Sequence, residues 1–465
     1  MVEQVITYSI IQKSKLESAH RLDAEYYQPE YLELEKRIYS TSAYKLWGNI
    51  EGRFITGPFG SEFGVENYTS ETQYRYIRGK DVKEFFLLNN DNVYIPEKDY
   101  ERLKKYSLRE SDILVSVVGT LGNAAIADSS VVPAIFSCKS TVFRTNSINP
   151  YYFIAYLNSI YGYKLLVRSV RGAVQTGLNI DDLKSLPVFI PSQKEQESIA
   201  SLVLNAKQEL NKSKLLYYQA EDLLLEKLGL NNFKPEEELS YIVNLSDVKS
   251  AHRADSEYFQ PKYEKIFNFI KIPICQLGEL IKFLNHAKQP PYVDNGKIPI
   301  ITQKHLGRAF LNLEFINDSG TKFTSNEWIK KYPLYKLKLG DVLYYSVGAY
   351  IGKTNIVLED LNATAASFIT IIRPKEELNP IYLIVVLNSV IGKLQSEKWQ
   401  SATAQQYIYP KDIKNFKIPI FHQSTQQKIA DLVQQSHQAR KKAKELLEKA
   451  KKEVEEFIEG KKHQR

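Results

Sequence analysis

The sequence has few of the residues that build covalently linked or metal-linked scaffolds. Its 465 residues include two cysteines, Cys138 and Cys275, which are far apart and show no Cys-x-x-Cys spacing. A disulfide framework and a zinc site are therefore not expected, and the composition is typical of a reducing cytoplasm. The seven histidines show no metal-binding spacing either. We predict a chain without a metal and without a cofactor.

Long hydrophobic runs are also missing. No stretch reaches 18 uncharged apolar residues, so we predict no membrane-spanning helix. The first residues, MVEQVITYSIIQKSK, place no basic leader before a sustained apolar stretch, and we expect no signal peptide there. Together these features predict a cytoplasmic protein. The formal net charge of +8 permits a polyanionic partner without requiring one.

Catalytic motifs are absent as well. The sequence contains no G-x-S-x-G nucleophile elbow and no nuclease-like Pro-Asp…Glu-x-Lys cluster. The stretches NPYY (149–152) and NPIY (379–382) resemble the Asn-Pro-Pro-Tyr of adenine methyltransferases, but both lack the second proline and neither follows a glycine-rich cofactor turn. We therefore interpret Pro150 and Pro380 as prolines in the first turn of a helix.

The chain contains a long internal repeat. The segments Ser18–Tyr31 (SAHRLDAEYYQPEY) and Ser250–Tyr263 (SAHRADSEYFQPKY) are identical at ten of fourteen positions, at an offset of 232. Further matches follow at nearly constant offset, and a repeat of this length predicts two homologous domains in tandem rather than a solenoid. We expect the matched His20 and His252 to dock the start of each domain rather than to catalyse a reaction.

The stretch SVGAYIGKT (346–354) ends like a nucleotide-phosphate loop. Such a loop needs four residues between its glycines and must open a helix. Gly348 and Gly352 enclose three residues and lie between two apolar runs. The counterpart SVVGTLGN (116–123) has two glycines but no Lys-Thr. In each repeat we therefore predict a strand–loop–strand turn with an exposed tip, not an ATP site.

Each repeat is predicted to have a strand-rich part followed by helices. Residues 45–147 and 272–376 are rich in Val, Ile, Tyr and Phe and are broken by turn residues, which is typical of short strands. One helix is expected at about 150–167 and its counterpart at about 380–397.

A long helix follows each globular part. Ser192 and Glu195 form a capping box for the first helix, Gly229 ends it, and the second helix runs from near Ser424 to Gly460. Apolar and small residues recur by fours and threes, which predicts two coiled-coil seams that pair with each other. The alternative is that each helix folds back on its own domain. The predicted seams are Ile199, Val203, Ala206, Leu210, Ser213, Tyr217, Ala220 and Leu224, and Leu432, Ser436, Ala439, Ala443, Leu446, Ala450 and Phe457.

These patterns predict an α+β chain. Two tandem homologous α/β domains are joined by two long helices that form an antiparallel coiled coil with pseudo-two-fold symmetry. The halves diverge most at about 50–105 and 275–335, so one scaffold carries two different reading surfaces. DNA offers such a molecule two oppositely directed half-sites. The predicted boundaries are 1–190 for the first domain, 191–229 for the central helix, 230–245 for a linker, 246–422 for the second domain and 423–460 for the C-terminal helix.

Over essentially its whole length the chain resembles the specificity subunit of type I restriction–modification systems. The markers are the doubled RLDAEYYQP and RADSEYFQP, YIRGKDV (76–82), VGTLGNAAI (118–126) and PSQKEQESIA (191–200). The resemblance implies two target-recognition domains that bind a bipartite target in double-stranded DNA. It also implies two methylation subunits as partners, with restriction subunits in the full complex. Methylation, ATP hydrolysis and cleavage then belong to those partners, and this chain is not an enzyme.

The candidate DNA-binding residues lie in three repeat-matched segments: YIRGKDV with IITQKHL (300–306), the two glycine loops, and AVQTGLN (173–179) with TAQQYIY (403–409). Arginine pairs bidentately with guanine and glutamine with adenine, although such side chains can instead satisfy loop backbone. The candidates are Arg78, Lys80, Thr120, Asn123, Gln175, Thr176, Gln303, Lys304, Tyr350, Lys353, Gln405, Gln406 and Tyr407.

Two other classes of protein compete with this interpretation. A methyltransferase or nuclease acting alone needs a cofactor or metal motif that the sequence does not show. A coiled-coil scaffold explains the helices but not two divergent faces on matched domains. Binding of S-adenosylmethionine by the isolated chain would favour the enzyme.

Overall fold

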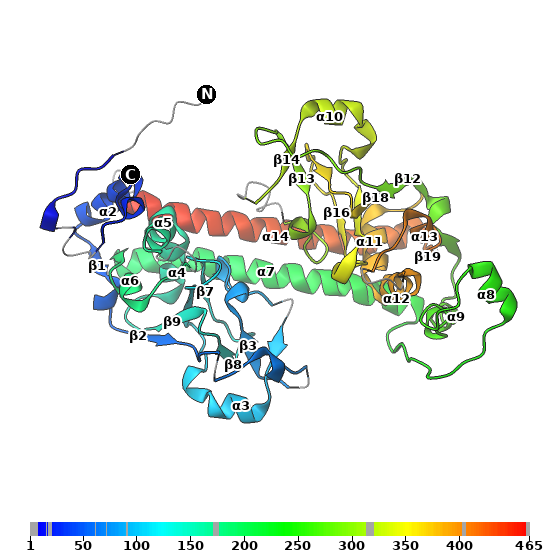
Figure 1. Ribbon diagram of the computed structural model, residues 1–465, viewed down its shortest axis with the longest axis horizontal. Helices are drawn as coiled ribbons and strands as arrows, with labels where there is room; N and C mark the ends of the chain where they lie inside the picture. The colour runs from blue at the N-terminus through cyan, green and yellow to red at the C-terminus, as the bar shows by residue number, and fades with distance from the viewer. Residues whose placement is uncertain are drawn as a thin grey trace. The chain divides into compact units, whose positions relative to one another are not determined.

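The computed structural model describes residues 8–14, 16, 21–60, 62–70, 72–89, 92–170, 176–312, 320–401 and 406–461. The chain divides into two compact units (Figure 1). Unit 1 comprises Met1–Leu210 and Lys441–Arg465, and unit 2 comprises Asn211–Arg440. Each of the two long helices, α7 (Gln193–Leu228) and α14 (Gln423–Ile458), contributes one half to each unit.

The rest of unit 1 consists of short strands followed by helices, as the turn-broken composition predicts. Its strands are β1 (Tyr44–Leu46), β2 (Arg53–Thr56), β3 (Arg75–Ile77), β4 (Phe85–Phe86), β5 (Val93–Tyr94), β6 (Ile113–Ser116), β7 (Ala124–Ile126), β8 (Ala134–Phe136), β9 (Ser140–Arg144) and β10 (Pro187–Phe189). Its helices are η1 (Ala24–Tyr27), α2 (Pro29–Ser40), η4 (Gly79–Asp81), α3 (Glu97–Arg102), α4 (Pro150–Asn158), α5 (Ile160–Arg168) and α6 (Ile180–Lys184).

Unit 2 repeats this set of elements. Its strands are β11 (Ile274–Gln276), β12 (Ile281–His286), β13 (Ile298–Ile301), β14 (Phe323–Thr324), β15 (Val342–Tyr345), β16 (Thr354–Ile356), β17 (Thr364–Ala365), β18 (Ile369–Pro374) and β19 (Lys417–Pro419). Its helices are α8 (Leu245–Ala251), α9 (Lys262–Asn268), η7 (Gln303–His305), α10 (Asn326–Lys331), α11 (Pro380–Asn388), α12 (Val390–Trp399) and α13 (Pro410–Ile413).

The two units share one sheet topology apart from an edge strand. In unit 1 the strand order is β2-β9-β6-β7-β4. In unit 2 it is β12-β18-β15-β16, and an isolated parallel bridge between Phe310 and Ile356 takes the place of the β4–β7 pairing. A smaller sheet lies beside each, with order β5-β3-β8 in unit 1 and β14-β13-β17 in unit 2. In both small sheets the central strand pairs antiparallel on one side and parallel on the other. The predicted tandem duplication is thus a duplication of fold.

The single helix expected at 150–167 is in fact two. Asn149 caps α4 by accepting hydrogen bonds from the N–H groups of Tyr151 and Tyr152, and Pro150 occupies its first turn as predicted. Ser159 then adopts an extended conformation and caps α5 through a bond from the Gly162 N–H. A serine that caps a second helix competes with continuation of the first. Ser389 divides the counterpart in unit 2 in the same way.

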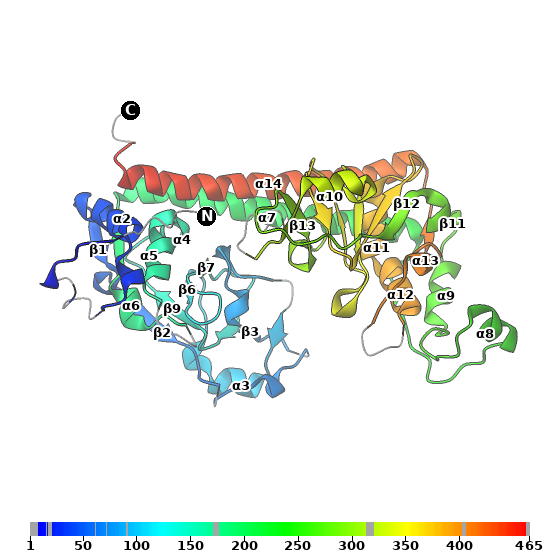
Figure 2. The same cartoon turned by 45° about the horizontal axis from the view of Figure 1, so that its top comes forward.

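The long helices pair antiparallel within each unit, as predicted (Figure 2). In unit 1, Ile199 and Val203 of α7 share a core with Ala450 and Val454 of α14. In unit 2, the Ser436 hydroxyl donates to the Ser213 carbonyl at 2.7 Å. Both cores also contain α4 or α11 residues, so pairing with the other helix and packing on the globular part occur together. The width of this buried stripe explains an error in the second predicted seam.

In that seam Ser436, Ala439, Ala443 and Ala450 are buried as expected. Leu432, Leu446 and Phe457 are only half-buried, as is Leu210 in the first seam. Val433, Val454 and Ile458 are buried instead. A helix that packs against two surfaces buries a stripe wider than two positions per heptad, which a strict seam pattern does not capture.

The doubled RLDAEYYQP segment docks the start of each repeat, but through arginine rather than histidine. Arg21 forms an ion pair with Asp23 and donates to the Ser169 carbonyl at 2.9 Å, at the end of α5. Arg253 pairs with Asp255 and donates to the Gln400 carbonyl at 2.9 Å, at the end of α12. His20 lies outside the described residues. The exposed His252 ends α8 in a left-handed conformation, so its predicted docking role is not what the structure shows.

No helix among the described residues has the length and hydrophobicity needed to cross a membrane.

Candidate nucleic-acid interface

In unit 1 the structure brings together the three segments in which the sequence predicts DNA-binding residues. The first is the turn η4, the second is the hairpin between β6 and β7, and the third is the stretch 176–178. The Asn123 amide in the hairpin donates to the Val82 carbonyl beside η4 at 3.2 Å. The Leu178 N–H donates to the Val117 carbonyl at 3.0 Å. These bonds fix both flanking segments to the base of the hairpin.

Unit 2 assembles the matching segments in the same way. The Tyr345 hydroxyl at the base of the β15–β16 hairpin donates to Gln303 Oε1 of η7 at 3.3 Å. The Gly348 N–H donates to the Gln406 carbonyl at 2.8 Å, and the Ile408 N–H donates to the Ser346 carbonyl at 3.0 Å. Three separate stretches of sequence therefore form one face in each unit, which we call the hairpin face.

Glycines with positive φ shape both hairpins. Gly119 and Gly122 have φ angles of +88° and +79°, and Gly348 and Gly352 have +77° and +89°. Side chains other than glycine are strained in this region. The loops connect two antiparallel strands in each unit, which confirms the strand–loop–strand prediction. A phosphate loop would have to open a helix that supplies its N-terminal N–H groups to the anion.

The strand registers correct one detail of the repeat alignment. Val118 bridges to Gly177 in unit 1, and Val347 bridges to Tyr407 in unit 2. Val117 therefore corresponds to Ser346. The sequence match had instead paired Ser116 with Ser346. The loop of unit 2 carries one additional residue between its glycines. Asn123 and Lys353 remain matched, each directly preceding a strand.

The unit 1 candidates differ in how accessible they are. Lys80 on η4, Thr120 at the hairpin tip and Thr176 are exposed. Arg78 donates to Asp81 through Nε and Nη2 at 2.9 Å each, which fixes the orientation of its guanidinium group. Asn123 satisfies a loop carbonyl, as the alternative reading of these polar side chains predicts. Gln175 lies outside the described residues.

The unit 2 candidates are more aromatic. Tyr350 at the hairpin tip is 51 % exposed, and Lys353 Nζ lies 5.7 Å from the centre of its ring. Burial lowers the pKa of Lys353. Gln406 is exposed, whereas Gln303, Lys304 and Tyr407 are half-buried. Gln405 lies outside the described residues.

Sequence reasoning missed three residues on or beneath this face. Tyr409 is 49 % exposed and its ring centre lies 4.5 Å from that of Tyr407. His286 ends β12 and bonds to both Tyr407 and Thr370. Thr370 has a matching threonine, Thr141, in unit 1, but the counterparts of His286 and Tyr409 there are different amino acids. The one sequence signal for His286 was a polar residue at the end of a predicted strand.

A framework common to both units holds the face in place. Asp112 accepts two bonds from Arg144, each at 2.7 Å, and Asp341 accepts bonds from Arg373 at 2.7 and 3.0 Å. Gln196 Oε1 of α7 accepts from the Asn149 N–H at 3.1 Å, and Gln426 of α14 accepts from the Asn379 N–H at 2.9 Å. The glutamines tie the start of each long helix to the cap of α4 or α11. The framework is therefore duplicated residue by residue while the face is not.

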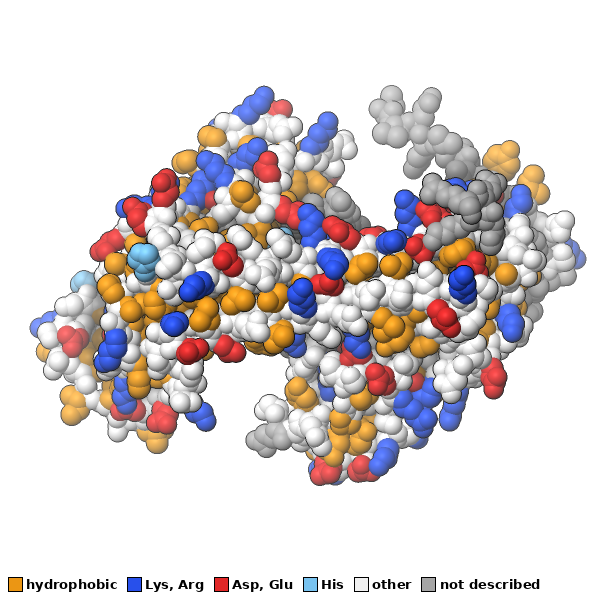
Figure 3. Space-filling model, turned by 180° about the vertical axis from the view of Figure 1, so that it is seen from behind, with side chains coloured by type: hydrophobic (Ala, Val, Ile, Leu, Met, Phe, Trp, Pro, Cys, Tyr) orange, Lys and Arg blue, Asp and Glu red, His pale blue; other side chains and the backbone are white. Residues whose placement is uncertain are grey.

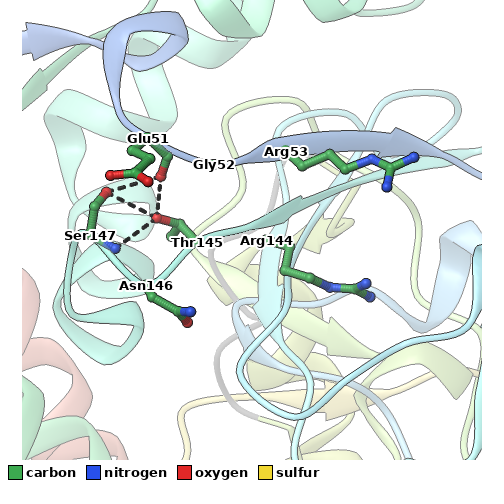
Figure 4. Close-up of a pocket in the computed structure, with 7 residues that line it drawn as sticks. All are labelled: Glu51, Gly52, Arg53, Arg144, Thr145, Asn146 and Ser147. Carbon is green, nitrogen blue, oxygen red and sulfur yellow. Dashed lines mark hydrogen bonds between the residues drawn. The ribbon is translucent and has the colours of Figure 1, made fainter.

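A pocket of about 450 Å³ in unit 1 lies at the opposite end of the sheet (Figure 4). It is lined by Glu51, Gly52, Arg53, Arg144, Thr145, Asn146 and Ser147. The β2–β9 register places Arg53 and Arg144 at one end and Thr56 and Thr141 at the other, next to the hairpin. Arg144 is engaged with Asp112, and the pocket is separate from the hairpin face.

On the face shown in Figure 3, Lys and Arg side chains are interspersed with Asp and Glu over most of the surface, so charge alone does not mark a binding surface on that face. Among the described residues, no group of His, Cys, Asp and Glu is arranged to hold a metal ion. The candidate interface thus rests on the geometry of the hairpin face.

Comparisons with known proteins place this geometry in context. The family model of the type I restriction modification DNA specificity domain matches residues 60–217 and 272–455, one match in each repeat. The fold is similar to a type I restriction-modification S subunit from M. genitalium, with 15% identity, 88% of this chain and 95% of that chain covered, and a TM-score of 0.42. An HsdS subunit from Thermoanaerobacter tengcongensis is similar at 15% identity, with 90% and 96% covered and a TM-score of 0.28. No curated protein matches the chain significantly.

Proposed function

This chain belongs to the type I restriction modification DNA specificity family, and from that premise we propose that its two units each bind one half of a bipartite target in double-stranded DNA. Specificity subunits of this family are generally non-catalytic and act in a complex with other subunits. In our proposal the hairpin face of each unit lies against the major groove. There, donor and acceptor patterns distinguish all four base pairs.

The observation that supports this proposal is the contrast between a duplicated framework and a divergent face. The pairs Asp112–Arg144 and Asp341–Arg373 are equivalent in the two units. The face they support carries Lys80, Thr120 and Thr176 in unit 1 and tyrosines in unit 2. A fold that is copied while one surface changes is what two different half-sites require. A scaffold without a reading function would not need this divergence.

We further propose that two methylation subunits bind the chain and that restriction subunits join them in the full complex. Adenine methylation, ATP hydrolysis and DNA cleavage then take place in those partners. The long helices α7 and α14 set the distance between half-sites and provide docking surface for the methylation subunits. The absence of catalytic motifs from the sequence supports this division of labour.

The functional boundaries remain those predicted: recognition domains at 1–190 and 246–422, spacer helices at 191–229 and 423–460, and a linker at 230–245. The two structural units do not coincide with these functional domains, because each long helix contributes to both units. A recognition domain in our proposal is the globular part of a unit without its half-helices.

Methylation mapping tests the proposal. A host that carries this chain with its methylation partner should show adenine methylation at one bipartite sequence, and deletion of the chain should abolish it. Replacing Lys80 and Thr120 on the unit 1 face should alter bases in one half of that sequence. Methylation at a single continuous site, or unchanged methylation without the chain, would contradict the proposal.

A further inference from the structure

A chain of hydrogen bonds in unit 2 connects the hairpin to the segment that follows α12. The Ser346 and Thr370 hydroxyl oxygens are 2.7 Å apart, and Thr370 Oγ1 lies 2.9 Å from His286 Nδ1. His286 Nε2 bonds to the Tyr407 hydroxyl. The four side chains come from the hairpin, β18, β12 and the 406–409 segment. Ser346 and Thr370 are completely buried, whereas Tyr407 reaches the surface.

The polarity of this chain follows from its buried end. Ser346 Oγ lies 3.4 Å from the Tyr344 carbonyl, which can only accept a hydrogen bond. When Ser346 donates there, its oxygen accepts from Thr370, and Thr370 accepts from the Nδ1–H of His286. His286 Nε2 is then unprotonated and accepts from the Tyr407 hydroxyl. In this polarity the imidazole donates through Nδ1 and accepts through Nε2.

Unit 1 does not contain the same chain. The sheet register pairs Thr56 with Thr141 where unit 2 pairs His286 with Thr370. Val117 stands in place of Ser346, and Gly177 in place of Tyr407. The framework around these positions is equivalent in the two units, so this polar chain is a feature of the unit 2 face alone.

We propose that His286 is a positioning residue for DNA recognition by unit 2, acting through the Tyr407 hydroxyl to hold the 406–409 segment on the glycine hairpin. This role rests on the proposed function, and it contributes to the base specificity of one half-site. Tyr407 packs against the half-exposed Tyr409 and directly follows the exposed Gln406 in the chain. Fixing one ring thus orders the exposed groups on either side of it.

The same geometry predicts that the bond between His286 and Tyr407 withstands acidification. Burial lowers the pKa of His286, so the ring is neutral at neutral pH. Within the described part of the chain, the ring bonds to the hydroxyls of Thr370 on β18 and Tyr407 on the 406–409 segment. Burial raises the pKa of Tyr407, so neither group is charged near neutrality. Acidification places a proton on Nε2, which then donates to the Tyr407 hydroxyl oxygen, so the bond reverses its direction and is kept.

The test uses the chain assembled with its methylation subunit and short duplexes that carry the mapped target, with one base pair replaced at a time. The variants are His286→Phe and Tyr407→Phe, with Thr56→Val as the matched control in unit 1. Both unit 2 variants should reduce discrimination at one or two positions of a single half-site by about tenfold. Their double variant should lose little more, because the two side chains form one interaction. Thr56→Val should leave that half-site unchanged.

Acidification of the unmodified complex from pH 7.5 to 5.5 should leave discrimination at these positions in place, because the protonated ring still donates to the Tyr407 hydroxyl. If His286→Phe disturbs folding, the Tyr407→Phe variant still decides the question. Retained discrimination in the Tyr407→Phe variant, or a loss spread equally over both half-sites, would overturn the inference. If the unmodified complex fails to bind the mapped target, the proposed function itself is wrong.

Discussion

The glycine hairpin of unit 2 allows two substitutions that look alike in sequence but differ in structure. Gly348 and Gly352 both have positive φ, +77° and +89°. A Cβ added at Gly348 meets nothing within 4 Å, whereas one at Gly352 lies 2.8 Å from Ser396 Oγ and 3.1 Å from Ser396 Cβ. Ser396 cannot rotate away freely, because its hydroxyl bonds to Tyr344 at 2.7 Å and to the Gly392 carbonyl at 2.8 Å.

The cost of each substitution follows from these contacts. Alanine in the left-handed conformation costs about 1–2 kcal/mol at either position. Gly352→Ala adds the displacement of Ser396, which loses two hydrogen bonds worth about 1 kcal/mol each. We therefore expect Gly352→Ala to lower the local opening free energy by about 2 kcal/mol more than Gly348→Ala does. Since about 1.4 kcal/mol corresponds to a factor of ten, the amides of β15 and β16 should exchange roughly 30-fold faster.

Hydrogen exchange followed by mass spectrometry of peptides spanning β15 and β16 measures this difference directly. Local exchange is the suitable measurement because a chain of two units does not unfold in one step. Adding Ser396→Gly to Gly352→Ala should accelerate exchange little further, since the two hydrogen bonds of Ser396 are already lost in the single variant. Gly119→Ala in unit 1, where an added Cβ also meets nothing, should behave like Gly348→Ala. Equal exchange in the Gly348 and Gly352 variants would refute the argument from contact.

Three further predictions concern recognition. Lys353→Ala should weaken binding to a target duplex about tenfold and, because its loop does not open a helix, should leave the ATPase rate of the assembled complex unchanged; loss of nucleotide binding by this chain alone would contradict this. Exchanging residues 45–185 with the corresponding domain of a relative should change one half of the mapped methylation site, and a change in both halves would contradict modular reading. Deleting one heptad from each long helix at matched levels removes about 10 Å of helix, equivalent to roughly three base pairs and a third of a turn of DNA; the preferred gap, measured on duplexes that vary one base pair at a time, should shorten or binding should cease.

The duplicated framework could be predicted from the sequence because its residues recur in both repeats. Caps, turn glycines and buried strands recur at a fixed offset, and each has a local signature such as Asn149-Pro150 or the Ser192/Glu195 capping box. The antiparallel pairing of the helices followed from their small-residue seams. The helix break at Ser159 was not predicted, since a serine inside an apolar helical pattern does not reveal by itself which of two competing hydrogen bonds it makes.

The hairpin face was only partly accessible. Its three segments were identified from repeat-matched polar residues, but their proximity depends on strand registers that no local pattern specifies. Asn123 satisfies a backbone carbonyl and Arg78 is engaged by a neighbouring carboxylate. Which polar side chains remain available is decided by such contacts. His286 was missed because its importance arises from residues 84 and 121 positions away in the chain.

The composition of the two units has a consequence for biosynthesis. Unit 2 is one continuous segment, whereas unit 1 needs both the first 210 residues and those from Lys441 onward. A chain emerging from the ribosome can therefore complete the later unit before the earlier one. Until α14 is synthesised, Ile199 and Val203 lack the cover that Ala450 and Val454 supply. The core of the earlier unit is thus completed only late in translation, and loss of the last twenty-five residues would destabilise unit 1 rather than unit 2.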